Sequence, residues 1–456
     1  MLDTWTRLLY TFKGIQVPKG NRRERIHHFM DKIYVIGGNR LEGKVKVSGS
    51  KNGTLAIMAG ALLAKGTTVL ENIPRIGDVN TMIEMLQQLG VHTCVTGANR
   101  VEIDASEVKS NEASYELVKK MRASFCVTGP ILARLGHARV PMPGGCDIGA
   151  RPVDFHVKGL QTLGAKVTIE HGYVEAEADR LKGANIYLDF PSAGATQHMM
   201  TAACLAEGIT KIENCALEPE VTDLADFLIA MGARITGAGT STIEIEGVDE
   251  LHGITYRVIP DRMEAGTFAI AAGITGGDIT LMDAIPEHCR AVFQKLQEAG
   301  MRVAVNNDSV RITAGRRPIA TDVKTMPHPG FPTDMQQPFA AMLTIADGTS
   351  VVSENVYERR FKYVAELQRM GADIVQEGRT AIIKGVPTLT GAEVAATDLR
   401  AGAALIVAGL VAEGRTEVSG VEHIDRGYED IVGKMESLGA SIVRREAAPE
   451  KAAKLA

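Results

Sequence analysis

Several features that would assign this chain to a specialised class of protein are absent from its sequence. The six cysteines are spread over 456 residues and form no CxxC pair, so neither a disulfide framework nor a zinc site is indicated. No apolar run approaches the roughly 20 residues of a membrane span. The net charge of −5 does not favour nucleic-acid binding. We therefore expect a cytoplasmic globular protein with neither nucleic acid nor membrane as a partner.

Aromatic residues are scarce at 5%, whereas glycine is abundant at 47 residues. Two glycine-ended phrases each occur six times: an apolar, Ala-rich helix, and an amphipathic helix followed by a β-branched run. We expect each glycine to be a left-handed helix stop. The first phrase ends at Gly66, Gly136, Gly208, Gly277, Gly348 and Gly414, and the second ends at Gly90, Gly164, Gly232, Gly300, Gly371 and Gly439.

The first set of glycines is spaced by 66 to 72 residues, which indicates six copies of one unit. Each unit predicts strand, helix, strand, helix, strand, and a further strand before the next copy. The apolar helices should be buried, and six units exceed a single core. We therefore expect an α/β fold of two domains with three units each. Residues 1–29 are expected to be a disordered leader or a misassigned start, and residues 446–456 a polar tail.

The second unit carries an insertion, "VPMPGGCDIGARPVD". Its two helix-ending glycines are 28 residues apart, whereas the other units have 23 to 25. Extra length in a repeat maps to a loop, and such loops often carry function. Cys146 follows two glycines there and precedes Arg151 and Asp154. A packing cysteine needs no such setting, so we predict a functional thiol.

Charged and polar residues recur where the first helix of each unit starts, and helix N-termini bind anions. Any one of them alone is more often a solvated flank or an N-cap. Their recurrence favours a site in which three helix starts from each domain converge on a cationic cleft with one carboxylate. Phosphate and carboxylate groups would suit that cleft. The residues are Lys51, Asn52, Arg122, Ser192, Gly194, Asp261, Arg262, Asp334, Asp398 and Arg400.

With "SGSKN", "MRAS…GP", "PGGCDIGARPVD", "PGFPTDMQ", "ERRF" and "ATDLRAGAALIVAGLVAEG" in this order, the chain resembles the UDP-N-acetylglucosamine enolpyruvyl transferases. The resemblance runs from about residue 30 to residue 445. It implies an inside-out α/β barrel of two domains, each with three βαβαββ repeats. Residues 30–50 plus 259–445 would form one domain, and residues 51–258 the other, which carries the cysteine loop.

The resemblance also implies an activity. The family transfers the enolpyruvyl group of phosphoenolpyruvate to the 3-hydroxyl of UDP-N-acetylglucosamine and releases phosphate, which is the first committed step of peptidoglycan synthesis. The reaction is an addition and elimination through a tetrahedral ketal. It needs a proton donor, a base and cations, and neither a cofactor nor a metal is implied.

Roles follow for individual residues of this chain. Cys146 would be the proton donor and the target of fosfomycin, and Asp334 would help to deprotonate the sugar hydroxyl. The cations Lys51, Arg122 and Arg400 would hold phosphoenolpyruvate, since arginine forks suit carboxylate and phosphate. The other implied contacts are Asn52 where the substrates join, Arg151, Pro152, Val153, Asp154 and Phe155 at the uridine diphosphate, Ser192, Ala193 and Gly194 at the same ligand, Val356 near the sugar, and Arg360 as a further cation.

One segment departs from the family pattern, which usually contains "SVGATEN". Here residues 192–198 are "SAGATQH", so Gln197 and His198 replace an acid and an amide. Two other functions stay open. Enolpyruvyl transfer to shikimate 3-phosphate is disfavoured, because those enzymes lack the cysteine loop and "GARPVD". A non-catalytic paralogue that binds the sugar nucleotide is disfavoured because every implied catalytic residue is present.

Overall fold

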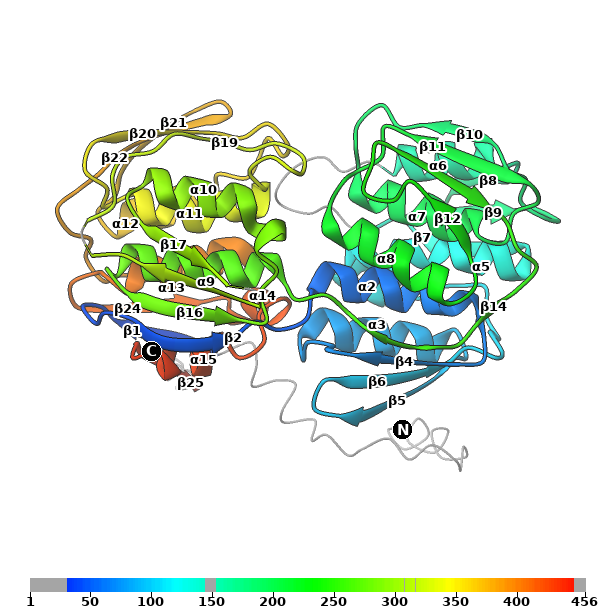
Figure 1. Cartoon of the computed structure of the whole chain (residues 1–456), viewed down its shortest axis with the longest axis horizontal. Coiled ribbons are helices and arrows are strands. Elements are labelled where there is room, and N and C mark those ends of the chain that lie inside the picture. The colour runs from blue at the N-terminus through cyan, green and yellow to red at the C-terminus, as the bar shows by residue number, and fades with distance from the viewer. Residues whose placement is uncertain (1–30, 144–152, 307, 316, 447–456) are drawn as a thin grey trace, which may run out of the picture.

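The chain has two hydrophobic cores, which lie in two halves side by side (Figure 1). The computed structural model describes residues 31–143, 153–306, 308–315 and 317–446. One core is built from residues within 33–47 and 263–442, and the other from residues within 55–258. The polypeptide crosses between the halves twice, near Gly49 and near Pro260, and these two residues pair in an isolated β-bridge.

The apolar phrases form helices that are buried, as the sequence predicts. Every residue of α9 is buried, because Ala, Gly and Phe cover all of its faces. The set is α2 (Lys51–Gly60), α5 (Thr128–Leu135), α7 (Ala193–Ala203), α9 (Arg262–Ile274), α11 (Gln336–Leu343) and α13 (Leu399–Gly409).

The amphipathic phrases form the second helix of each unit. Their six glycines all have a left-handed backbone, with φ between +85° and +108°, and each lies two residues after the last helical residue. The prediction of a left-handed stop is confirmed here. The helices are α3 (Gly77–Gln88), α6 (Asp154–Thr162), α8 (Pro219–Ala230), α10 (Arg290–Glu298), α12 (Tyr363–Arg369) and α15 (Ile431–Ser437).

The glycine stop is wrong for most of the apolar helices. Only α5 ends directly at its glycine, Gly136. In four other units the helix ends earlier, and the glycine has a positive φ in the turn before the next strand. After α9, the left-handed residue is Gly276 rather than Gly277. The positive φ is therefore used to enter a strand more often than to end a helix.

Six sheets, one per unit, alternate buried and exposed residues along their strands. Five of them follow the chain order of their own unit. In the sixth, β1 lies between β24 and β25 and pairs antiparallel with both, so the start of the described chain completes the last unit. β2 likewise joins β16 in parallel. Among the described residues, no helix is long and apolar enough to cross a bilayer.

The strand orders are β15 (Thr255–Arg257), β4 (Thr67–Glu71), β6 (Arg100–Asp104), β5 (His92–Gly97); β7 (His137–Pro141), β9 (Tyr173–Glu177), β8 (Lys166–Glu170); β10 (Asn185–Tyr187), β11 (Ile209–Glu213), β13 (Thr242–Glu246), β12 (Arg234–Thr236); β17 (Arg302–Val305), β18 (Ser309–Thr313), β16 (Asp278–Met282), β2 (Glu42–Lys46); β19 (Val323–Lys324), β20 (Thr349–Ser353), β22 (Thr380–Lys384), β21 (Asp373–Glu377); and β23 (Glu393–Ala395), β24 (Arg415–Ser419), β1 (Asp31–Ile36), β25 (Ser441–Glu446). A separate pair joins β14 (Leu251–His252) to β3 (Ala64–Lys65).

The left-handed stops can be tested at Gly164, which has φ +91° and open space where a Cβ would lie. Gly164→Ala should lower the free energy of unfolding by about 1 kcal/mol through backbone strain alone. The matched control is Gly315→Ala, because Gly315 also has open space but no positive φ. Urea unfolding midpoints measure both variants, and an equal midpoint for the two would contradict the assignment.

Candidate active site

A cavity of about 320 Å³ lies between the two halves and is lined by residues of both. Five of the six predicted helix starts reach it. They come from α2, from the 3₁₀ helix η3 (Arg122–Val127), from α7 and α9, and from the 3₁₀ helix η5 (Thr333–Met335). The predicted convergence is therefore confirmed for these five. Of the predicted substrate-binding residues, the cavity wall includes Asn52, Arg122, Val153, Ala193, Gly194, Asp334 and Val356.

The charge of this wall differs from the prediction of a single carboxylate. Among the described lining residues, Arg122 and Arg262 are accompanied by three carboxylates, those of Glu218, Glu220 and Asp334. Further cations stand behind the wall, and two of the three carboxylates are paired with buried arginines. The cleft is thus a set of ion pairs rather than a bare cationic surface.

Asp334 lies between two buried guanidinium groups. Arg360 Nη2 is 2.7 Å from Oδ1, and Arg400 Nε is 3.0 Å from Oδ2. The arginine side chains are only 4% and 2% exposed, whereas Asp334 is 24% exposed at the cavity. Burial alone would raise the pKa of Asp334, but the two guanidinium charges hold it well below its usual value. The carboxylate is therefore ionised at neutral pH.

The two arginines keep unused hydrogen-bonding capacity. Arg400 Nη1 and Arg360 Nε are buried and have no hydrogen-bond partner among the described residues. Arg400 starts α13, whose N-cap Asp398 accepts the backbone N–H groups of Arg400 and Ala401. Its guanidinium carbon lies 5.2 Å from the centre of the Tyr428 ring. Buried donors without partners are rare, so these atoms are suited to an anionic ligand.

Glu354 fixes the loop that carries Arg360. Its carboxylate is fully buried and accepts hydrogen bonds from the hydroxyl groups of Thr325 and Thr333, each at 2.8 Å. It also accepts the backbone N–H of Val356 at 2.7 Å. The Thr333 hydroxyl in turn accepts from Arg360 Nη1 at 2.9 Å. This network links β20, the Val356 loop and η5, and it sets where Asp334 stands.

Lys51 belongs to a second charge cluster, which spans the two halves. Its Nζ is 2.8 Å from Asp78 Oδ2, and Asp78 also accepts two bonds from Arg426, at 2.8 and 3.2 Å. Burial lowers the pKa of Lys51, against the opposing charge of Asp78. Sequence reasoning missed Asp78 and Arg426, because a lone acid in "IGDVN" and a lone arginine in "HIDRGYED" carry no spacing signal.

A third buried ion pair crosses between the halves within the cavity wall. Arg262 Nε, at the start of α9, lies 3.0 and 3.2 Å from the two carboxylate oxygens of Glu220 on α8. Both side chains are less than one-tenth exposed. Burial alone would raise the pKa of Glu220, but the charge of Arg262 holds it below its usual value. Glu220 is another residue that the sequence did not single out.

The predicted nucleotide-binding residues lie at the starts of α6 and α7. Val153 is buried before α6, Asp154 is exposed, and half-buried Phe155 lines a separate small cavity. Ser192 caps α7 by accepting the N–H of Ala195. Cys146, Arg151 and Pro152 lie outside the described residues, so the predicted cysteine loop stays a prediction.

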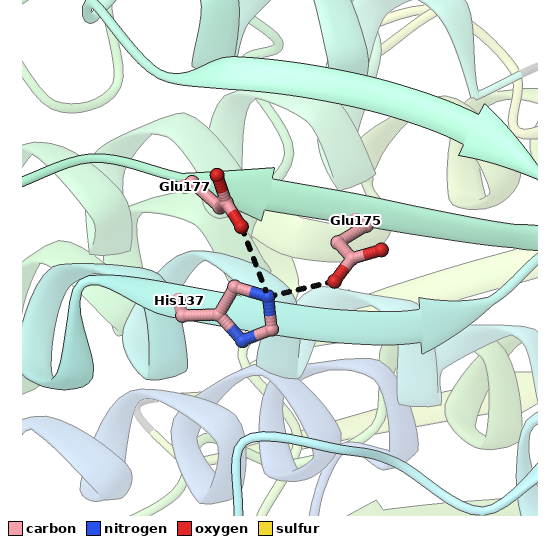
Figure 2. A group of neighbouring side chains, drawn as sticks. All are labelled: His137, Glu175 and Glu177. Atoms are coloured by element: carbon pink, nitrogen blue, oxygen red, sulfur yellow. Dashed lines mark hydrogen bonds and ion pairs between the residues drawn. The ribbon is translucent and has the colours of Figure 1, made fainter.

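A separate polar group lies on β7 and β9, and none of its members lines the cavity (Figure 2). His137 Nε2 is 2.8 Å from Glu175 and 3.6 Å from Glu177, so the three could hold a metal ion. However, His137 Nδ1 is 2.5 Å from the amide nitrogen of Asn111. If that amide donates, Nε2 carries the proton and donates to Glu175. We interpret the group as a cross-strand ion pair, and the expectation of no metal stays a prediction.

The Arg262–Glu220 pair provides a test of the link between the halves. Glu220→Gln should lower the free energy of unfolding by about 3 kcal/mol, because it leaves the Arg262 charge buried without its partner. Asp249→Asn is the matched control, since it breaks an exposed pair with Arg180 and should cost less than about 1 kcal/mol. Urea unfolding of both variants measures the difference. Equal midpoints would mean that Glu220 does not carry the link.

Residues 35–435 match the family model described as EPSP synthase (3-phosphoshikimate 1-carboxyvinyltransferase). The UDP-N-acetylglucosamine 1-carboxyvinyltransferase 1 of Caldanaerobacter subterraneus subsp. tengcongensis is 56% identical over 89% of this chain and 97% of that protein. The UDP-N-acetylglucosamine 1-carboxyvinyltransferase of a Nostoc species is 53% identical, with coverage of 92% and 95%.

Solved structures show the same likeness. The enolpyruvyl transferase NikO from Streptomyces tendae matches with a TM-score of 0.82 and 28% identity over 92% of this chain and 99% of that one. An EPSP synthase from Acinetobacter baumannii, at 21% identity and a TM-score of 0.73 over 91% and 100% of the two chains, shares the fold. The chain thus has the α/β fold of the enolpyruvyl transferases, and it belongs to the UDP-N-acetylglucosamine 1-carboxyvinyltransferase family.

Proposed function

We propose that this protein transfers the enolpyruvyl group of phosphoenolpyruvate to the 3-hydroxyl of UDP-N-acetylglucosamine, releases phosphate, and so begins peptidoglycan synthesis. The observation that carries the proposal is the meeting of five helix starts at one cavity, where Asp334 stands between two buried arginines. Such a cavity offers both a carboxylate and donors for anions. The names of relatives at 52–56% identity support the same reaction.

Phosphoenolpyruvate would bind at the buried cations. Arg400 Nη1 lacks a partner among the described residues and would donate to its phosphate or carboxylate. Lys51, 2.8 Å from Asp78, would supply a compact second charge, and Arg426 a third on the same carboxylate. Arg122 and Arg360 would complete the set. Five cations around one small trianion would stabilise the charge that develops during addition.

Asp334 would remove the proton of the sugar 3-hydroxyl, but its surroundings set a condition. With both guanidinium groups in place, the pKa of Asp334 lies well below its usual value, so the carboxylate is a weak base. A phosphoenolpyruvate anion at Arg400 would neutralise part of that positive charge and raise the pKa. The base would then become effective only once both substrates are bound.

The nucleotide sugar would occupy the opposite wall. The start of α7, with Ser192, Ala193 and Gly194, would face the diphosphate, because free N–H groups at a helix start attract anions. Arg151, Pro152, Val153, Asp154 and Phe155 would hold the uridine end. Asn52 would bond where the two substrates meet, and Val356 would pack near the sugar.

Cys146 would protonate carbon 3 of phosphoenolpyruvate while the sugar oxygen attacks carbon 2. The product of addition is a tetrahedral ketal that still carries the phosphate. Loss of a proton from carbon 3 and departure of phosphate then form the enolpyruvyl ether. A thiol in a cationic loop suits this role, since nearby positive charge lowers its pKa.

The proposal extends to architecture and location. We take the two cores to be two domains, residues 30–50 plus 259–445 and residues 51–258, each an inside-out α/β barrel of three βαβαββ units. The reaction would take place in the cytoplasm, where its thiol stays reduced. The five described cysteines are all free.

The decisive experiment measures phosphate release from phosphoenolpyruvate, with and without UDP-N-acetylglucosamine, before and after fosfomycin. Release should require the nucleotide sugar and stop with fosfomycin. Cys146→Ala should lose most turnover, whereas Cys146→Asp should keep turnover and resist the drug, because a carboxyl group can still donate a proton. Release with shikimate 3-phosphate instead would favour the sister reaction. Binding of the nucleotide sugar without any release would favour a non-catalytic paralogue.

Asp334→Asn should reduce kcat by about a hundredfold or more, the scale typical of losing a general base. The KM for UDP-N-acetylglucosamine should change much less. Asp249→Asn, at a side chain 94% exposed, is the control and should keep full activity. If Asp334→Asn retained its kcat in a folded enzyme, this aspartate would not be the base.

A further inference from the structure

Two histidines face each other in the wall of the cavity. His156 on α6 lines the cavity, and His198 on α7 is fully buried behind it, with the two Nδ1 atoms 2.9 Å apart. The ring of Phe125 packs edge-on against both, at centroid distances of 5.4 and 5.9 Å. A hydrogen bond between two Nδ1 atoms needs one proton and one lone pair. At least one ring is therefore neutral.

Their surroundings favour two neutral rings. Burial lowers the pKa of His156 to about 4, and the charge of Arg122 acts in the same direction. Burial, followed by the neighbouring His156, holds the pKa of His198 well below its usual value. At neutral pH each ring therefore carries one proton, and the single bond between them decides which nitrogen holds it in both.

The far side of His198 identifies the donor. Its Nε2 is buried and has no hydrogen-bond partner among the described residues. The ring lies against Gly129, where a Cβ would come within 3.0 Å of that nitrogen. If His156 donated, His198 would bury an unpaired N–H at this nitrogen. If His198 donates, the nitrogen is bare, and buried N–H groups without partners are the rarer case.

The proton of His156 is then fixed on the other side of its ring. With Nδ1 accepting from His198, a neutral His156 carries its hydrogen on Nε2. That nitrogen lies 4.0 Å from where a Cβ of Gly194 would stand, beside the first turn of α7. An N–H donor, a helix start and the Arg122 charge thus occupy the same wall of the cavity. Together they suit a phosphate oxygen.

We infer that His198 is a positioning residue that fixes His156 as the Nε2–H tautomer, and that His156 donates this hydrogen to the diphosphate of the nucleotide sugar. The identity of the ligand rests on the proposed function. The pairing itself does not, since it follows from the protein alone. Sequence reasoning had treated His198 only as a departure from the family pattern.

Nitrogen-15 NMR of the ligand-free, histidine-labelled enzyme at pH 7 tests the tautomers directly. We expect a protonated Nδ1 in His198 and a protonated Nε2 in His156, assigned by the spectra of His198→Asn and His156→Gln. Addition of UDP should shift the Nε2–H of His156 and leave the tautomer of His198 unchanged. A proton on Nε2 of His198 would overturn the inference, whatever the activity of the enzyme.

Kinetics test the role of the donor. His156→Leu and His198→Leu should each raise the KM for UDP-N-acetylglucosamine about tenfold, the scale of one hydrogen bond to a charged group, with kcat within about twofold. His156→Gln and His198→Asn should stay close to the parent, because their amides can replace Nε2–H and Nδ1–H. If His198→Leu does not fold, His156→Leu carries the test. An unchanged KM in His156→Leu would overturn the proposed contact.

The two proposals fail in different ways. If UDP does not bind and no phosphate is released, the proposed function is wrong, and the contact with the diphosphate is wrong with it. If turnover requires both substrates but the tautomers are reversed, only the inference about the histidine pair is wrong.

Discussion

The carboxylate of Asp261 holds the two helix starts on which the site depends. It accepts the backbone N–H of Lys51 at 2.9 Å and those of Met263 and Glu264 at 2.7 and 3.0 Å. Lys51 opens α2 in one half, and Met263 lies in the first turn of α9 in the other. One buried side chain therefore caps helices of both cores, beside the bridge of Gly49 and Pro260. The side chains that follow, including Lys51 and Arg262, inherit their positions from it.

The charges of the site are held in pairs before any substrate arrives. Asp334 is paired with Arg360 and Arg400, and Glu220 with Arg262. Isolated charges could not be buried this deeply, because desolvation would cost too much. An anionic substrate must therefore exchange partners with an existing pair rather than fill an empty field. This arrangement couples the basicity of Asp334 to the occupancy of the arginines.

Much of this organisation could be predicted from the sequence, because it repeats. Six glycines such as Gly90 and Gly232 follow amphipathic helices, and their left-handed backbone is a local property that spacing reveals. The convergence of the helix starts was also predictable, because equivalent positions of a repeat share a location. The early ends of the apolar helices were not, since an Ala-rich run leading to a glycine resembles a helix up to its stop.

The pairs that cross between the halves could not be predicted. Asp78 and Arg426 are 348 positions apart in the sequence, and Glu220 and Arg262 are 42 apart. Neither separation follows the repeat, so nothing local marks the partners. His198 was visible as an unusual residue, but its partner His156 resembled an ordinary polar position at a helix start. Both kinds of contact depend on how separate elements face one another, which periodicity does not specify.

Because the cavity lies between two separately packed cores, a ligand that touches both walls acts as a cross-link. Its binding free energy adds to the resistance of the folded enzyme to heat and proteases, by about 2.7 kcal/mol when the ligand is present at a hundred times its Kd. Cells rich in the nucleotide sugar would thus hold a longer-lived enzyme than starved cells. The supply of wall precursors would then set the abundance of the enzyme as well as its rate.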